Sequence, residues 1–352
     1  MVENFADLYT DYLISSTTLT TATGMSSLLA ISHDKITRSL SKGNYDSKYL
    51  WQHVKPIVHE LTTSKEEIIL SFDDSIEEKM YTDESPLICW HYDHVFKRNV
   101  KGVNFLTALV DVGGAKLPVA VEFVRKDLLE LNEKGKPKRT SSKTKNELFR
   151  EMISRSYYNF YFDYVVADSW YSSHEKMELI KRALNSNFII ALKSNRLVAL
   201  SKADKKSDKY VNIESLPLEQ QTVEVWFKEL DFPLLLVKQV FKNEDDTVGE
   251  LYLACSDLNL SYERITTIYK KRWGVEVYHK SVKSNAGFAK SPTKTQKTQS
   301  NHFMLSILAY VKLELLYLRK NKNHFAMKQI IYQAATKAAH LKLMELLTPS
   351  AA

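Results

Sequence analysis

The sequence of 352 residues has little cysteine: only Cys89 and Cys255 are present, and each lies in an apolar stretch. This argues against a disulfide framework and favours a reducing compartment, with both cysteines in the core. No apolar run approaches the ~20 residues of a membrane-spanning helix, and the start, MVENFAD, lacks the basic-then-apolar order of a signal peptide. These absences predict a soluble intracellular protein.

The charge is unevenly distributed along the chain. The net charge is +7, but residues 262–352 contain 16 Lys and Arg against 4 Asp and Glu, a net +12 that leaves −5 for the rest. A basic segment gains affinity for a polyanion by releasing the counterions condensed on its phosphates, so nucleic acid is the expected partner. A basic surface that serves solubility alone is the alternative.

The N-terminal segment, residues 1–61, predicts a helical bundle. Apolar helical periodicity begins at Phe5, and a helix-turn-helix pattern follows, with a short helix over 24–30 and a second helix that begins at His33 after Ser32 as its N-cap. A third helix is expected over 46–61. The second helix would present three polar side chains to a DNA groove: Lys35, Thr37 and Arg38.

Carboxylates and bases follow several predicted strands. The segment EEIILSFDDS, residues 66–75, ends on Asp73 and Asp74, and YVVAD ends on Asp168. A further strand over 188–192 leads to Lys193 and Arg196. Side chains at strand ends leave an open sheet at an exposed rim, where α/β proteins bind their ligands. Two acidic ends and one basic end are therefore candidate parts of a site.

The other segments complete an α/β pattern. Strands are expected over 103–112 and 117–124, joined by a Gly113-Gly114 turn. A mobile basic loop over 125–146, helices over 146–160 and 174–185, an antiparallel insertion within 205–256, and helices over 302–319 and 325–346 are expected as well. A polar loop carries Cys89, His91 and His94, but a zinc site is disfavoured because no second ligand pair lies at a matching distance.

The segment YKKRWGVEVYHKSVK, residues 269–283, predicts a single helix. A narrow arc of about 60° on this helix would carry a phenol, a guanidinium, a carboxylate and an ammonium, from Tyr269, Arg272, Glu276 and Lys283. An apolar stripe beside this arc would dock the helix on the core; it consists of Ile268, Val275 and Val282. For any one of the charged pairs, a solvated surface salt bridge is the alternative.

The order of elements is that of a ribonuclease-H-like α/β fold, and the motifs carry a resemblance. The helix matches Y-x2-R-x3-E-x6-K, FDDS fits D-x-[ST], and ADSWY fits a second acid followed by an aromatic. Together, over about residues 60–300, they resemble the DDE transposases of bacterial insertion sequences, in the subgroup with the Y-R-E-K signature. The resemblance implies a DNA-binding domain over 1–61, a catalytic domain over 62–300 with a β-rich insertion at about 200–258, and a C-terminal region over 301–352 for DNA contact and dimerisation.

The resemblance also implies an activity. Such an enzyme binds the terminal inverted repeats of its element as a homodimer on double-stranded DNA, cleaves there, and transfers the 3′-OH ends to target DNA in the bacterial cytoplasm. In-line displacement at phosphorus suits two metal ions ~3.5–4 Å apart, and Mg²⁺, with Mn²⁺ as a substitute, prefers carboxylate ligands. Asp73, Asp168 and Glu276 would supply them. Asp74 is the alternative first acid, since neighbouring strand residues point to opposite faces and cannot both serve.

Other residues are candidates for DNA contact. Arg272 and Lys283 can neutralise phosphates that flank the cut, and Tyr269 can hydrogen-bond a phosphate. In TVEVWFKEL, alternation places Trp226 opposite the valines and among charges, which suits stacking on an unpaired base, as a tryptophan of the family's insertion does. A packing role remains the alternative, because a one-residue slip exchanges the faces. A non-transposing endonuclease of the same fold and an inactive DNA-binding derivative are the alternative functions.

Overall fold

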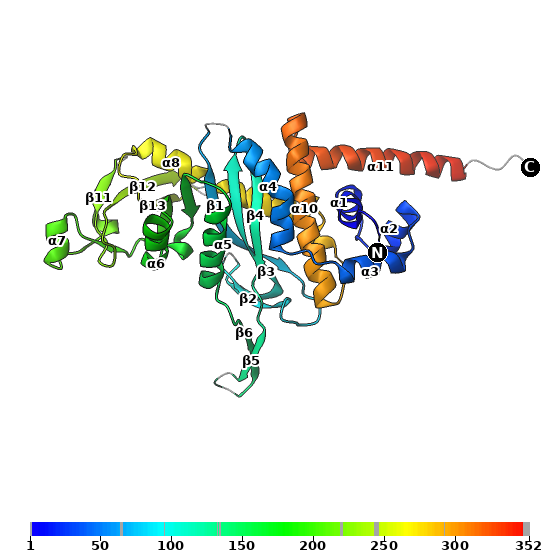
Figure 1. Ribbon diagram of the computed structural model, residues 1–352, viewed down its shortest axis with the longest axis horizontal. Helices are drawn as coiled ribbons and strands as arrows, with labels where there is room; N and C mark the ends of the chain where they lie inside the picture. Colours follow the sequence, from blue (N-terminus) through cyan, green and yellow to red (C-terminus); the bar gives the residue numbers. More distant parts are fainter. Residues whose placement is uncertain are drawn as a thin grey trace, which may run out of the picture.

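The computed structural model describes residues 2–63, 66–94, 96–131, 133, 135–218, 221–242, 246–291 and 293–347. Its centre is a mixed sheet with the strand order β11-β12-β13-β8-β7-β1-β3-β2, and β4 also pairs with β3. Helices α1–α3, α10 and α11 lie towards one end of this sheet and β11–β13 towards the other (Figure 1). The fold is therefore a mixed α/β structure, in which the helices surround one central sheet.

The strands of the central sheet are β1 (Ile69–Glu78), β2 (Cys89–Asp93), β3 (Arg98–Val112), β4 (Ala115–Phe123), β7 (Tyr164–Ala167), β8 (Asn187–Leu192), β11 (Val223–Val225), β12 (Leu234–Lys242) and β13 (Val248–Cys255). Two small pairs lie outside it, β5 (Leu128–Leu131) with β6 (Pro137–Thr140), and β9 (Leu197–Val198) with β10 (Val211–Asn212). Within the central sheet β7 runs parallel to β1 and β8, and the other pairings are antiparallel.

The α-helices are α1 (Phe5–Ser15), α2 (Ala22–Leu29), α3 (His33–Lys42), α4 (Ser47–Leu61), α5 (Lys145–Asn159), α6 (His174–Glu178), α7 (Lys202–Lys206), α8 (Tyr262–Lys270), α9 (Trp273–Asn285), α10 (Gln296–Lys320) and α11 (His324–Leu347). A short 3₁₀ turn, η1 (Ser169–Tyr171), follows β7, and a π-helical turn, η2 (Leu179–Ala183), continues α6. None of the helices in the described part of the chain is long and apolar enough to cross a membrane.

The structure has helices where the N-terminal sequence predicts them. Ser32 precedes α3 at its N-cap position, although its side chain makes no capping hydrogen bond. Asp46 caps α4 by accepting from the Tyr49 N–H at 2.8 Å. Buried residues of α1, α3 and α4 belong to the same apolar cluster as the central sheet and α10. The helices are therefore packed on the sheet through a continuous core.

The β3–β4 hairpin is also confirmed. Gly113 and Gly114 adopt φ values of 56° and 75°, as a two-residue turn with two left-handed positions requires. Strand β3 is longer than expected: its residues 102–111 pair with the whole of β1, and its start pairs with β2. Gly102 of β3 lies so close to β1 that a Cβ there would be 2.2 Å from the carbonyl oxygen of Glu77. This close approach lets β3 hold β1 on one side and β2 on the other.

Three expectations about irregular segments are wrong. The region carrying Cys89 and His91 is strand β2 rather than a loop, because it pairs with the extended start of β3. The basic region after Val124 contains the β5–β6 hairpin rather than only a loop. Strand β1 does not end on its two acids but continues to Glu78, since β3 remains paired beside it.

The segment expected as a small antiparallel insertion has antiparallel strands that extend the central sheet. Cys255 of β13 pairs with Ile189 of β8, and β12 and β11 follow outward. A helical piece, α7, and the β9–β10 pair lie beside this edge and reach the sheet through a bridge between Ala199 and Trp226. The strands after β8 therefore enlarge the sheet that carries the acids.

The single helix expected over 269–283 is divided. Helix α8 ends at Lys270 and α9 begins at Trp273, and between them N–H groups bond three residues back, as from Arg272 to Tyr269 at 2.9 Å. Ile268 and Val275, both fully buried, belong to two different apolar clusters. The break lets each half pack on its own part of the sheet while it keeps Ile268, Val275 and Val282 buried.

Candidate active site

Two carboxylates lie side by side on adjacent strands at the centre of the sheet. The parallel pairing of β1 and β7 places Phe72 opposite Ala167, so Asp73 and Asp168 follow at the same level. Pairing with β7 stops here while pairing with β3 continues. The carboxyl end of β7 thus forms the open rim that the sequence predicts. Asp73 lies at this rim although β1 itself continues beyond it.

The side chain of Asp168 is held by the turn that follows it. As the N-cap of η1 it accepts a hydrogen bond from the Trp170 N–H at 2.9 Å. Asp73 accepts a similar bond from the Asp74 N–H at 2.9 Å. Backbone donors orient both carboxylates while they leave oxygen atoms free to accept other partners.

Arg272 connects the third acid to this pair. Its guanidinium donates to Glu276 at 2.8 Å across one helical turn, and lies 3.7 Å from an Asp73 oxygen. The side chain of Arg272 is 17% exposed and that of Glu276 36%. The start of α9 therefore brings Glu276 beside β1, and a cationic group already neutralises part of the negative charge there.

The electrostatics of the acids reflect crowding and partial burial. Burial, with Asp168 and Asp74 nearby, raises the pKa of Asp73 to about 7, although Arg272 acts in the opposite direction. Burial also raises the pKa of Asp168, against the Trp170 N–H and Arg272, which lower it. Carboxylates brought this close repel one another, and a further positive charge would relieve that repulsion.

Asp74 faces the other side of the sheet, where it is fully engaged. Both of its oxygens accept from the Lys145 ammonium at 3.0 Å, and it also accepts from Asn104 at 3.1 Å and the Tyr171 hydroxyl at 3.3 Å. Sequence reasoning missed this network. The available signal was the capping box of Thr144, which fixes the start of α5 and hence the position of Lys145.

The two outer residues of the 269–283 motif have separate surroundings. Tyr269 is 7% exposed and packs in the apolar cluster under α8, and burial raises its pKa to about 12. Lys283 donates to the backbone carbonyl of Ile76 and lies 3.9 Å from Glu77, and burial lowers its pKa. Both residues border the acids along β1, with Lys283 towards the far end of that strand.

The remaining candidates are dispersed. Lys193 is exposed after β8, whereas Arg196 donates to Ser172 at 3.1 Å and so braces the turn after Asp168. Trp226 is partly buried, and the ammonium groups of α7 lie over its ring at 5.6 and 5.8 Å; these are Lys202 and Lys205. On α3, Lys35, Thr37 and Arg38 are all exposed.

Asp73, Asp168 and Glu276 are ligands of the kind that a hard divalent cation prefers, but their side chains are not grouped as a metal-binding cluster. Across residues 2–347 with the gaps given above, no three His, Cys, Asp or Glu side chains are grouped closely enough to hold a metal ion. Glu276 is paired with Arg272 instead. Three carboxylates from three elements, two of them with raised pKa values, have the chemistry that Mg²⁺ prefers.

The residues considered for a zinc site are not grouped around one point. Cys89 and His91 contact each other at 3.2 Å, whereas the ring of His94 lies beside that of Trp170.

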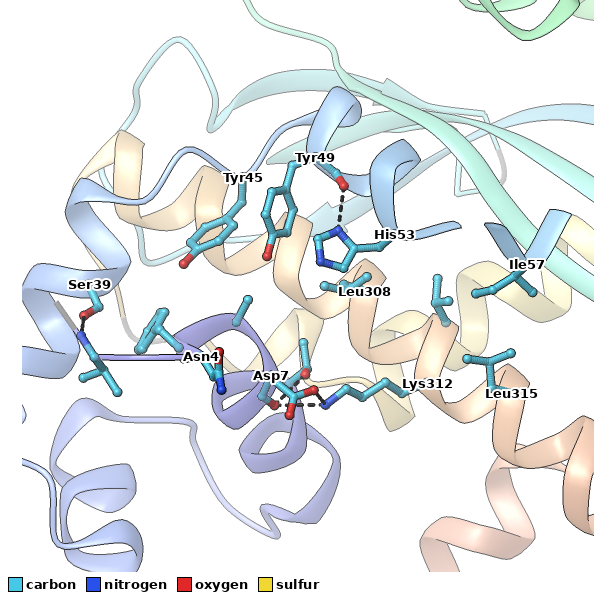
Figure 2. Close-up of a pocket in the computed structure, with 15 residues that line it drawn as sticks. Asn4, Asp7, Ser39, Tyr45, Tyr49, His53, Ile57, Leu308, Lys312 and Leu315 are labelled. Atoms are coloured by element: carbon cyan, nitrogen blue, oxygen red, sulfur yellow. Dashed lines mark hydrogen bonds and ion pairs between the residues drawn. The ribbon is translucent and has the colours of Figure 1, made fainter. Parts of the chain in front are cut away.

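A separate pocket lies between α1, α4 and α10, away from the acids (Figure 2). Tyr45, Tyr49 and His53 line one wall. On another side, Lys312 of α10 forms ion pairs with Asp7 at 2.6 Å and with Asp11 at 2.8 Å. The ion pairs join α1 to α10, so the pocket belongs to the packing of the N-terminal helices.

Comparison with known proteins identifies a family for the chain. The model of the DDE transposase family described as "Archaeal putative transposase ISC1217" matches residues 7–323. The chain belongs to this family. The matched range includes Asp73, Asp168 and Glu276, begins within α1 and ends just before α11.

Other comparisons add little to this assignment. No curated protein matches the chain. Among solved structures, an endonuclease V from Bacillus subtilis shows a distant similarity, with 10% sequence identity, a TM-score of 0.25, and coverage of 73% of this chain and 84% of that one. Membership of the transposase family rests on the family model alone.

Proposed function

We propose that this member of the transposase family is an active DNA transposase of the Y-R-E-K type with a ribonuclease-H-like catalytic core. It binds the terminal inverted repeats of an insertion sequence, cleaves there, and transfers the 3′-OH ends to target DNA. The observation that carries the proposal is the meeting of Asp73 and Asp168 on adjacent strands with Glu276, which Arg272 holds beside them. The order β4-β3-β1-β7-β8 within the sheet supports the core assignment.

The proposed roles follow from the chemistry of phosphodiester transfer. Asp73, Asp168 and Glu276 would hold two Mg²⁺ or Mn²⁺ ions, which supply an activated attacking oxygen and stabilise the leaving oxygen when bound. Arg272 keeps the crowded carboxylates compatible with one another and can contact the phosphate beside them. Asp73 is preferred to Asp74, since Asp74 already accepts from Lys145 on the opposite face.

Partners follow from the exposed and basic parts of the chain. Helix α3 presents Lys35, Thr37 and Arg38 to solvent, which supports a role in reading the transposon ends. Lys193, Lys283 and the basic C-terminal third would contact phosphates. The far half of α11 extends from the body with apolar side chains exposed, which supports dimerisation on DNA (Figure 1). We place this activity in the cytoplasm, at the nucleoid.

The test is cleavage and joining of a plasmid that carries candidate element ends, in the presence of Mg²⁺. Asp168→Asn and Glu276→Gln should abolish nicking and joining while they keep binding to the same ends, and Asp231→Asn, at an exposed surface ion pair, should behave as wild type. Cleavage without joining would identify an endonuclease of this fold, and binding without cleavage an inactive derivative. Full cleavage by Asp168→Asn would refute the assignment of the acids.

A further inference from the structure

An aromatic surface adjoins Asp168 at the open rim of the sheet. Trp170, two residues after Asp168, is 46% exposed, and Tyr92 on β2 is 50% exposed. The ring of His94 lies between them, 5.8 Å from Trp170 and 4.9 Å from Tyr92, measured between ring centroids. We call Tyr92, His94 and Trp170 the aromatic wall. Large exposed rings gathered from separate elements are costly unless they meet a partner.

The aromatic wall is fixed to the candidate catalytic acid. The backbone N–H of Trp170 donates to Asp168 at 2.9 Å, so the backbone from which the indole projects stays close to that carboxylate while the bond holds. Arg196 braces the same turn through Ser172. A flat group stacked on Trp170 would therefore lie beside the reacting phosphate at a defined position.

Cationic groups border the aromatic wall. The Lys145 ammonium lies 4.9 Å from the centre of the Trp170 ring and also binds Asp74. At the other end, Lys101 is paired with Trp90 on β2, and Lys126 donates to the Trp90 carbonyl. Trp90 is 52% exposed and lies on the same face of β2 as Tyr92, because alternate strand residues share a face. Rings with ammonium groups beside them suit a ligand with π faces and phosphates.

We propose that the aromatic wall, with Lys145, binds an unpaired nucleotide next to the scissile phosphate. The rings would stack on the base, and Lys145, which lies beside the Trp170 ring and is already paired with Asp74, would add positive charge near the phosphate of that nucleotide. Stacking of this kind tolerates any base, because each presents a π face. The inference deepens the proposed function and rests on it. It is separate from Trp226, which lies at the far edge of the sheet under two lysines.

The test compares two single-stranded oligonucleotides with equal charge. One is an octathymidylate, and the other has the same phosphates but only abasic residues, so the ratio of their dissociation constants isolates the bases. The wild-type chain should prefer the base-bearing strand by about tenfold. Trp170→Ala should remove most of this preference, and Trp170→Phe, which keeps a ring, should retain it. Tyr158→Ala, at a ring 83% exposed on α5, is the matched control and should change nothing.

Lys145→Met should weaken binding of both strands equally and reduce the slope of log affinity against log salt by about 0.7. Equal binding of the two strands by the wild type would overturn the inference, and so would an unchanged preference in Trp170→Ala. If Trp170→Ala instead altered the mass in light scattering and left the preference intact, the wall would be a contact between copies of this chain, and the inference would be wrong.

Failure of the inference can be told from failure of the proposed function. Metal-dependent cleavage of duplex ends with no preference for the base-bearing strand would refute the aromatic wall alone. Binding of neither duplex nor single strand would refute both.

Discussion

Burial of His302 should make the stability of this protein depend on pH in a defined way. The ring is fully buried between α1 and the turn after α9, with Nδ1 2.9 Å from the Tyr9 hydroxyl and Nε2 3.1 Å from the Gly287 carbonyl oxygen. A carbonyl only accepts, so Nε2 carries the proton and Nδ1 accepts from Tyr9. The neutral ring therefore satisfies both partners, and burial lowers its pKa from 6.5 to about 3.

The free energy of unfolding depends on pH because the folded and unfolded states bind different numbers of protons at His302. Between pH 6.5 and about 3 the unfolded chain binds a proton at His302 and the folded chain does not, so the free energy of unfolding falls as the pH falls. Above pH 6.5 the contribution is fully present. Each pH unit below 6.5 lowers the free energy of unfolding by about 1.4 kcal/mol, so the loss is about 2 kcal/mol at pH 5.

The perturbation is His302→Gln, which can keep both hydrogen bonds but cannot titrate. Urea unfolding followed by tryptophan fluorescence at pH 7.5 and pH 5 gives the pH-dependent loss for each protein. The wild type should lose about 2 kcal/mol more than the variant over this interval. His279, whose pKa burial also lowers to about 3, is present in both proteins and cancels.

The matched control is His33→Gln, since the His33 side chain is 62% exposed and hydrated in both states. It should keep the pH dependence of the wild type. An equal loss in His302→Gln and wild type would show that this ring does not resist protonation, and the reasoning from burial would fail.

Three further substitutions test the packing around the site. Gly102→Ala should lower the melting temperature and destabilise by about 2 kcal/mol or more, because its Cβ would meet the Glu77 backbone; a melting temperature equal to wild type would contradict this. Glu314→Gln should expose the α10–α11 junction to limited proteolysis, since the buried carboxylate pairs with His324 at 2.9 Å, and unchanged cleavage would show that the pair is dispensable. Thr144→Ala should cost about 1 kcal/mol in urea unfolding by removing a capping box, and Thr144→Ser should recover it.

Local signals were sufficient for much of the fold. The glycine pair at 113–114, the short strand before Asp168 and the buried stripe of Val275 and Val282 each follow from neighbouring residues alone, and the structure confirms them. The meeting of Asp73 with Asp168 also follows, because parallel neighbours bring their carboxyl ends together. In each of these segments, the secondary structure is determined by local turn residues or by the periodicity of apolar residues.

Other parts depended on contacts distant in sequence. Strand β2, CWHYD, mixes ring and polar side chains, and it is a strand because the start of β3 is available to pair with it. The break at Lys271 follows from two apolar clusters that lie under different strands, which a helical wheel cannot reveal. The partners of Asp74 come from three elements, so the capping box at Thr144 marks where α5 begins, but no spacing along the chain links Lys145 to Asp74.

The shared core of the N-terminal helices and the sheet has a consequence for how DNA would be measured. Since α1, α3 and α4 pack with α10 and β4 in a single apolar cluster, and Lys312 joins α10 to α1, the helix α3 and the sheet that carries the acids are parts of one packed unit. Such packing would keep a constant distance between α3 and the acids. The number of base pairs between the sequence that α3 is proposed to read and the phosphate that would be cut should then be fixed, and five inserted pairs, about half a turn of the duplex, should turn the scissile bond to the wrong side.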